Sequence, residues 1–299
     1  MSGYRLEVVE YTDPLCPWAW GSEPKLRLLR RQLEGVAEFR RVFGLLFEDE
    51  DDPAPDPDAE TAWYARYVEG ITAHTGAPRA VRLHRVAASS RPASLAAAAA
   101  EAQGAEVAER VLRRLRETAF VLGEPADTPA RVLAALDGVP GLDRARLHAD
   151  LGSAAVLERI SRDRAETRRP VPDVVGLRGE GPHPGAAKET EDGYRYALPT
   201  LLFTGPGGRR AVPGWRTGAE YLAAARAVSP GLEVRPGDLA AADQLERYRS
   251  LTVTELGPEP AGRPPGALVL PTGNGPLLLH PDERAGSPLF SGPRRAHRP

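Results

Sequence analysis

The chain contains a single cysteine, Cys16, in a setting that can make its thiol reactive. Cys16 follows a short β-branched run and a turn, and Pro17 and Trp18 come directly after it, so we expect it at the first turn of a helix. The positive end of a helix dipole favours a thiolate over a thiol. A thiolate attacks disulfides and electrophilic carbon. The sequence therefore predicts a nucleophilic site at Cys16.

The elements that would position Cys16 are a strand, a helix and a second strand. Residues 5–11 are rich in β-branched residues and predict the first strand, and the helix begins at Cys16 and ends at Gly35. Residues 39–47 form a second apolar, aromatic-rich run. Two strands joined through a helix are typical of a parallel βαβ unit, which predicts that fold for the N-terminal part.

A long helical segment then separates two β-containing parts of the sequence. Residues 48–60 are acidic and proline-rich, which predicts an exposed loop. Residues 61–167 are helical in composition, with an amphipathic pattern that is weakened or kinked at Gly104. Further helix starts are predicted at Thr128, Asp143 and Ser153.

Strand signals return after this segment. Residues 197–203 and 209–212 predict an antiparallel pair around a glycine-rich turn, and Thr217 begins a Thr-x-x-Glu capping box ahead of another helix. Beyond residue 230 the predicted elements are a helix at 238–251, hairpin strands at 267–270 and 277–279, and a disordered tail rich in proline and arginine.

Three separated stretches resemble the DsbA-type thioredoxin-fold proteins, especially their cytosolic FrnE-like branch. They are Asp-Pro-Leu-Cys-Pro-Trp-Ala-Trp at 13–20, Ser-Ser-Arg-Pro-Ala at 89–93 and Leu-Pro-Thr at 198–200. In the family these correspond to the active-site motif, the start of a helical insertion and the cis-proline strand. The resemblance covers roughly residues 4–228, and it implies a thioredoxin-like α/β fold with a large all-helical insertion and a C-terminal extension.

The resemblance also implies a division of the chain and a geometry for its site. The expected thioredoxin-like domain comprises residues 4–50 and 168–229, the inserted helical domain residues 51–167, and the C-terminal extension residues 230–299. Pro199 is expected to be cis and to face Cys16, with backbone groups of Leu198 available to align an extended ligand.

One departure from the FrnE-like motif changes the expected chemistry. The family motif reads Cys-Pro-Trp-Cys, and Ala19 stands at the position of its second cysteine. A dithiol cycle needs two thiols within bonding distance, so Cys16 has to act alone. Three functions remain open: attack on carbon, monothiol disulfide exchange, and ligand binding without catalysis.

Attack on carbon fits these residues best. Reversible addition of the Cys16 thiolate to a polyene or enoyl small molecule, free or carried on a carrier protein, would make the protein a cofactor-independent cis–trans isomerase of bacterial specialised metabolism. Chromene-carboxylate isomerases and kappa-class transferases are relatives of similar architecture that provide an analogy. The alternatives are a DsbA-family oxidoreductase served by a low-molecular-weight thiol and a non-catalytic peptide-binding adaptor.

Seven further residues are candidates for contact with the substrate. Trp18 is expected over the thiol and Trp20 in the core, and Arg91 can hold a carboxylate or a carrier phosphate if the insertion folds over the cleft. The six histidines lack metal-ligand spacing, so no metal is expected. The candidate substrate-binding residues are Pro17, Trp18, Leu198, Pro199, Tyr11, Asp13 and Arg91.

The charge and hydropathy of the sequence argue against nucleic acid and membrane as partners. With 39 basic and 41 acidic residues the net charge is −2, so a nucleic-acid partner is not expected. No apolar run reaches the eighteen or so residues of a membrane span, and the N-terminus carries no export pattern, so we expect a cytoplasmic protein that acts on a small molecule.

Overall fold

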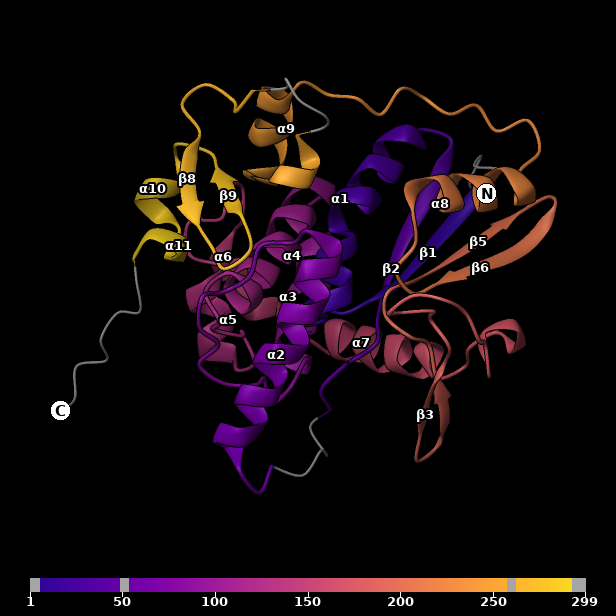
Figure 1. Ribbon diagram of the computed structural model, residues 1–299, viewed down its shortest axis with the longest axis horizontal. Coiled ribbons are helices and arrows are strands. Elements are labelled where there is room, and N and C mark those ends of the chain that lie inside the picture. Colours follow the sequence, from indigo (N-terminus) through magenta and orange to yellow (C-terminus); the bar gives the residue numbers. More distant parts are fainter. Residues whose placement is uncertain (1–5, 49–53, 257–261, 292–299) are drawn as a thin grey trace. The chain divides into compact units, whose positions relative to one another are not determined.

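The computed structural model describes residues 6–48, 54–256 and 262–291 (Figure 1). Contacts between residues divide the chain into two compact units, which are described separately below. The first unit comprises Met1–Leu46 and Glu158–Asp238, and the second comprises Phe47–Leu157 and Leu239–Pro299. No helix in the described part of the chain is both long enough and apolar enough to cross a membrane.

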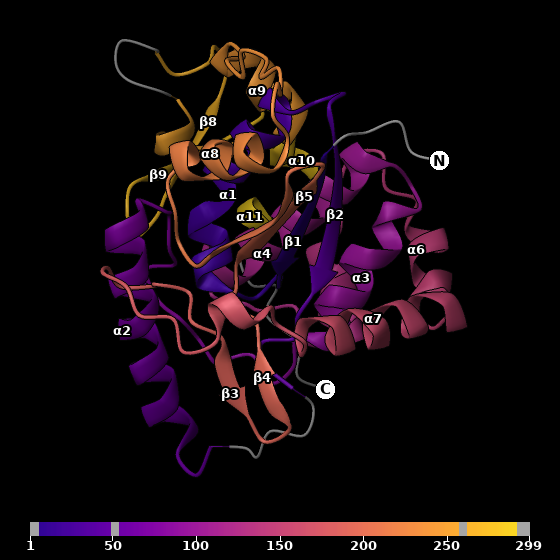
Figure 2. The ribbon, with the colours of Figure 1, turned by 90° about the vertical axis from the view of Figure 1, so that its right-hand side faces the viewer.

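The first unit is built on a four-stranded mixed sheet with the order β2-β1-β5-β6, which is labelled in Figure 1. Figure 2 shows β1, β2 and β5 of this sheet from another side. β1 and β2 pair in parallel, and the other two pairings are antiparallel. β5 begins at Thr200 because Pro199 has no N–H to donate to a neighbouring strand. The strands are β1 (Leu6–Thr12), β2 (Ala37–Phe43), β5 (Thr200–Gly205) and β6 (Gly208–Pro213).

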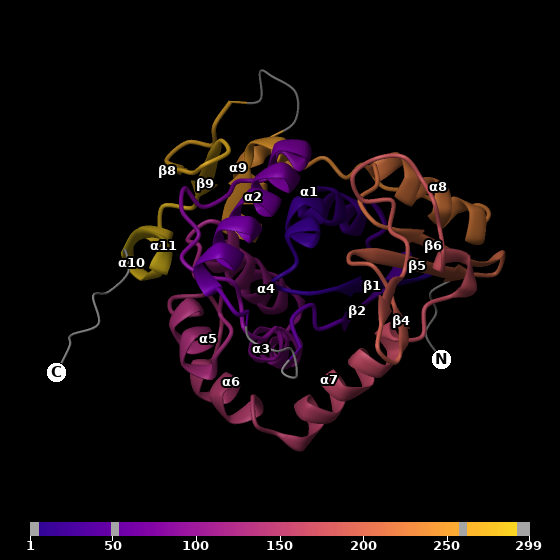
Figure 3. The same cartoon turned by 60° about the horizontal axis from the view of Figure 1, so that its bottom comes forward.

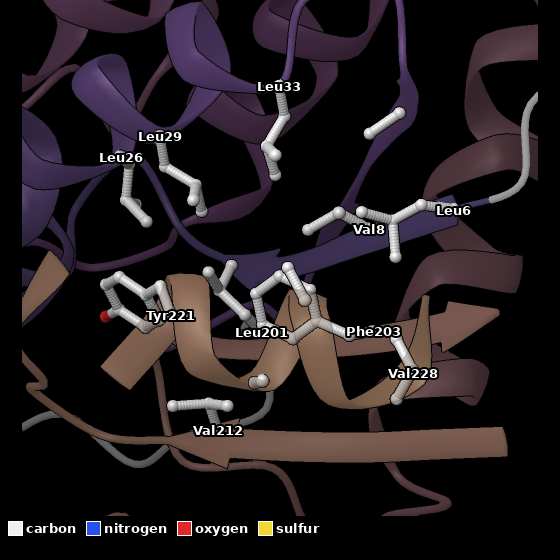
Figure 4. Close-up of a cluster of buried hydrophobic side chains, with 13 residues drawn as sticks. Leu6, Val8, Leu26, Leu29, Leu33, Leu201, Phe203, Val212, Tyr221 and Val228 are labelled. Atoms are coloured by element: carbon white, nitrogen blue, oxygen red, sulfur yellow. The ribbon is translucent and has the colours of Figure 1, made fainter. Parts of the chain in front are cut away.

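Helices α1 (Pro17–Gln32) and α8 (Gly218–Val228) cover one face of this sheet. The apolar side of α1 and that of α8 meet the inward residues of the strands in one hydrophobic cluster (Figure 4). Alternate residues of β1 point to opposite faces, so Leu6 and Val8 join this cluster whereas Tyr11 faces α7 (Ala154–Thr167), where its hydroxyl bonds Glu166. The sheet therefore separates the α1 and α8 layer from the C-terminal half of α7.

The second unit begins with helices. The predicted kink at Gly104 is a complete break between two helices, because Gly104 adopts a φ of 110° that only glycine accommodates readily. The helices are α2 (Pro57–Thr75), α3 (Arg91–Glu101), α4 (Ala105–Phe120), α5 (Pro129–Ala135) and α6 (Arg144–Asp150) (Figure 3). Thr128, Asp143 and Ser153 accept the expected backbone hydrogen bonds at three helix starts.

The C-terminal residues complete the second unit. The sequence predicts a separate extension at 230–299, but Leu239 and the residues after it group with the helices. Buried Arg113 explains this grouping, because its guanidinium contacts Glu117 on α4 and Ser250 near the C-terminus at 2.8 and 2.9 Å. The added elements are α9 (Ala241–Tyr248), β7 (Ser250–Thr252), β8 (Leu268–Pro271), β9 (Pro276–Leu279), α10 (Glu283–Gly286) and α11 (Pro288–Ser291).

Some boundaries differ from those that the sequence predicts. The acidic stretch 48–60 is not a loop throughout, because α2 already starts at Pro57, where Asp56 caps it by accepting from Ala59 N at 2.9 Å. The hairpin of β3 (Lys188–Thr190) and β4 (Gly193–Arg195) has no counterpart in the predicted elements. The tail after residue 279 is predicted to be disordered, but α10 and α11 form in its first part. Its last part, residues 292–299, lies outside the described residues.

Candidate active site around Cys16

Cys16 stands at the start of α1, as its spacing from Pro17 and Trp18 predicts. It is the N-cap residue, its backbone is extended, and no side chain caps the helix at this point. First-turn amide groups lack acceptors within a helix, so this end of α1 favours a negative charge on the sulfur. The side chain is only 3% exposed, and Sγ lies 3.5 Å from the carbonyl oxygen of Leu198.

The turn before Cys16 is held by Asp13. One carboxylate oxygen of Asp13 accepts from Leu15 N at 2.6 Å, and the other accepts from Leu46 N at 2.8 Å. The side chain is fully buried. These contacts tie the turn to the chain that leaves β2, so Asp13 fixes the position of Cys16 through the backbone.

The Leu198–Pro199 peptide bond, which lies beside Cys16, is cis. Gly214 N donates to the Pro199 carbonyl at 2.8 Å and so fixes the bond against the end of β6. The Leu198 side chain packs over Gly44, where a Cβ would lie 3.1 Å from its methyl groups, so a larger residue at position 44 would crowd it. Leu198 and Pro199 therefore form one rigid wall beside the thiol.

The carbonyl of Leu198 is not available in the way that the resemblance implies. It accepts a hydrogen bond from the ring of His183, whose Nε2 lies 2.9 Å away, and it is the same oxygen that Cys16 Sγ approaches. A carbonyl only accepts, so His183 carries its proton on Nε2 in this contact. An extended ligand would have to share or displace this bond.

His183 is the site residue that sequence reasoning missed. It comes from the loop before β3, it is 8% exposed, and its ring stacks on Trp18 with centroids 4.8 Å apart. The pKa of His183 is lowered to about 4, mainly by burial. The charges of Lys188 and Arg216 also lower it, whereas the bond to the Leu198 carbonyl raises it. No local pattern marks this histidine, because only the folded chain brings it to Cys16.

We expect this lowered pKa to appear as a pH dependence of stability. Below its ordinary pKa of about 6.5 the histidine binds a proton in the unfolded chain but not in the folded one. The stabilisation is therefore complete above that pH and is lost as the pH falls toward 4. Urea unfolding between pH 7 and 4.5 should show a smaller loss for His183→Asn, which keeps an N–H donor but does not titrate. Identical pH profiles would contradict the assignment.

Other residues that the sequence nominates have partners of their own. The Tyr11 hydroxyl donates to Glu166 at 3.0 Å, its ring stacks on Tyr196 with centroids 4.1 Å apart, and burial raises its pKa. Trp20 is 1% exposed and lies in the core, as expected. Arg91 begins α3 in the second unit, where its backbone N–H donates to Ser89 Oγ at 3.0 Å.

Ala19 lies one helical turn after Cys16 and is fully buried. The methyl group thus stands at the position of the second cysteine in the Cys-Pro-Trp-Cys motif that the sequence resembles. Within the residues that the structure describes, no three histidine, cysteine, aspartate or glutamate side chains gather closely enough to hold a metal ion.

The chain is similar to known proteins in sequence and in fold. A sequence profile described as Thioredoxin matches residues 10–168, just over half of the chain. The ClpXP adapter protein SpxH of Shouchella clausii is 31% identical over 173 residues. That alignment covers 57% of this chain and 56% of SpxH, so the chain spans a little over half the length of this curated relative.

Solved structures share the fold at low sequence identity. A putative protein disulfide isomerase from Nitrosomonas europaea has a TM-score of 0.54 and 14% identity, with 75% of this chain and 95% of that chain covered. The cytosolic disulfide reductase DsbM from Pseudomonas aeruginosa has a TM-score of 0.50 and 17% identity, with 74% and 93% covered. These similarities support a thioredoxin-like α/β fold with additional helices.

Proposed function

The chain belongs to the thioredoxin family, and from that premise we propose that it is a single-thiol enzyme, a cofactor-independent cis–trans isomerase of a conjugated small molecule. The isolation of Cys16 carries this proposal. Ala19 fills the place from which a resolving sulfur would act, and the sequence contains no other cysteine. A thiolate that cannot close a disulfide within the chain remains available for addition to carbon.

The proposed reaction conserves atoms and electrons without a co-reactant. The Cys16 thiolate adds to the β-carbon of a conjugated acyl substrate, a C–S bond forms, and the π electrons move to the carbonyl oxygen to give an enolate. The former double bond is then single and rotates. Return of the electron pair expels the thiolate and leaves the other geometric isomer.

The surroundings of Cys16 suit these steps. The start of α1 stabilises the negative sulfur before attack and after expulsion. The residues around it are apolar and buried, which suits a conjugated chain: Leu198 and cis-Pro199 lie beside the sulfur, and Trp18 stacks on His183. The hydrogen bond from His183 to the Leu198 carbonyl holds that wall in place.

The test is conversion of conjugated enoates by wild type and by Cys16→Ser in buffer that is free of small thiols, nicotinamide and metal. We expect wild type to equilibrate the isomers and the serine variant to be inactive, because an unactivated hydroxyl is far less nucleophilic than a thiolate. Nuclear magnetic resonance of the alkene protons measures both isomers directly. Conversion by Cys16→Ser at the wild-type rate would contradict the proposal.

A strict need for added thiol in the same assay would favour the monothiol oxidoreductase instead. In that reaction Cys16 forms a mixed disulfide that a low-molecular-weight thiol must resolve. Wild type should then reduce a generic disulfide only when the small thiol is present, and it should leave conjugated enoates unchanged.

The similarity to the ClpXP adapter protein SpxH supports a third candidate, a peptide-binding adaptor. In that function the wall at Leu198 would align an extended segment, and the thiol would be dispensable. The bond from His183 to the Leu198 carbonyl would have to open first. Peptide binding that Cys16→Ser leaves unchanged, together with no conversion of any enoate, would support the adaptor over the isomerase.

A further inference from the structure

Three cations lie in the first unit around the loop that carries His183. They are Lys25 on α1, Lys188 on β3 and Arg216 after β6. The sequence contains only two lysines, and both are in this group. We call Lys25, Lys188 and Arg216 the cationic cluster.

Arg216 contacts the loop that carries His183, and Lys188 follows that loop in sequence as the first residue of β3. The positive charges of Lys188 and Arg216 both act on the ring and lower its pKa. Arg216 also reaches the same loop directly, because its Nη2 donates to the Pro184 carbonyl at 2.6 Å. Positive charge therefore acts on the side chain that shares the Leu198 carbonyl with Cys16.

Lys25 extends the cationic cluster along α1. It follows Trp18 by seven residues, which is two helical turns, so both side chains lie on one face of the helix. Its Nζ lies 3.4 Å from the ring centroid of Trp215 and donates to the Arg216 carbonyl at 2.5 Å. Trp215 N in turn donates to the His183 carbonyl at 3.3 Å. This hydrogen bond links the Lys25–Trp215 pair to the Trp18–His183 pair.

Positive charge exceeds negative charge in this group. Among the residues that the structure describes, its acidic partner is Glu220, whose Oε1 lies 3.7 Å from Arg216 Nε and whose side chain is about half exposed. Burial lowers the pKa of Lys25 to about 7. An arriving anion would favour the protonated amine, so the lysine can gain charge on binding.

We propose that the cationic cluster binds an acidic group, a carboxylate or a phosphate, on the molecule that reacts at Cys16. This inference rests on the proposed function and names its substrate class as anionic conjugated molecules. At about 1.5 Å of rise per residue, the helix places Lys25 about 13 Å along its axis from Cys16. An acidic group several bonds away from the reacting alkene can therefore reach the cluster.

The experiment compares two alkylating reagents that differ only in charge. Iodoacetate and iodoacetamide react with thiolate in the same way, and all thiol alkylation is on Cys16 because the chain has no second cysteine. Peptide mass analysis counts only the label on Cys16. We expect the rate ratio of iodoacetate to iodoacetamide to exceed that of free mercaptoethanol by about threefold or more at low ionic strength. High salt should bring the two ratios together.

Matched variants show which residues cause the preference for the anionic reagent iodoacetate. Lys25→Met and Lys188→Met should each lower the ratio toward that of mercaptoethanol, and Lys188 is exposed, so its replacement should not disturb folding. The control is Arg209→Met, an exposed cation in the same unit. Arg209 lies at the hairpin end of β5 and β6, where it pairs with Thr204. The site lies at the other end of these strands, where Thr200 pairs with Pro213. Arg209→Met should therefore leave the ratio unchanged.

Competition distinguishes the two acidic groups. Slower iodoacetate labelling with added acetate points to a carboxylate, and slower labelling with inorganic phosphate points to a phosphate. If iodoacetamide labels Cys16 but charge makes no difference, the inference is overturned and the proposed function stands. If neither reagent labels Cys16 in the folded protein, both are overturned, because the thiol is then not accessible to a substrate.

Discussion

Ala19→Cys should give the protein a dithiol chemistry that the wild type lacks. The change places a second thiol one turn after Cys16 at the start of α1, the spacing of the family motif, where two sulfurs reach bonding distance. We expect an intramolecular disulfide under mild oxidation and reductase or oxidase activity on a generic disulfide. Isomerase activity should disappear in the oxidised variant and return with reductant, since the disulfide withholds the nucleophile.

The cost to folding should be modest. Ala19 is fully buried, so an added sulfur has to be accommodated by its neighbours, and overpacking of this kind costs roughly 1–3 kcal/mol. Ala19→Ser is the matched control, because it adds an atom at the same place without a second thiol. Titration of free thiols before and after oxidation measures the disulfide. If both thiols stay free, the geometry at the start of α1 is not that of a dithiol motif.

Local signals explain which parts of the fold could be predicted from the sequence. Cys16-Pro17 marks the start of α1, and the leucines that follow it repeat at helical spacing. Thr217 forms a complete capping box with Glu220, and α8 begins where that box predicts. These residues act on their own neighbourhood, so their effect can be recognised without the rest of the chain.

Contacts between distant residues explain what could not be predicted. The sequence shows α4 as an amphipathic helix, yet Arg113 and Arg114 on it are buried. Their partners Ser250 and Glu283 are more than a hundred residues away. No periodicity reveals such pairs, and they are the reason that the C-terminal residues belong to the second unit.

The same distinction applies to the site. Nearness in sequence nominates Tyr11 and Asp13, and the structure gives their polar atoms hydrogen-bond partners within the protein. His183 lies 167 positions after Cys16, yet both side chains reach the Leu198 carbonyl. The spacing of histidines along the sequence can indicate a metal-ligand motif. It cannot indicate that a histidine bonds a backbone oxygen of a distant residue.

The most direct test of the account is to capture the covalent adduct on Cys16. An acidic ynoate, the alkyne counterpart of the proposed substrate, accepts the thiolate by the same addition but forms a vinyl thioether that does not readily eliminate. Intact-mass analysis of wild type should show one adduct per chain, located on the peptide that contains Cys16, and Cys16→Ser should show none. If wild type converts the matching enoate but forms no adduct with the ynoate under the same conditions, catalysis by covalent addition of a single thiol is contradicted.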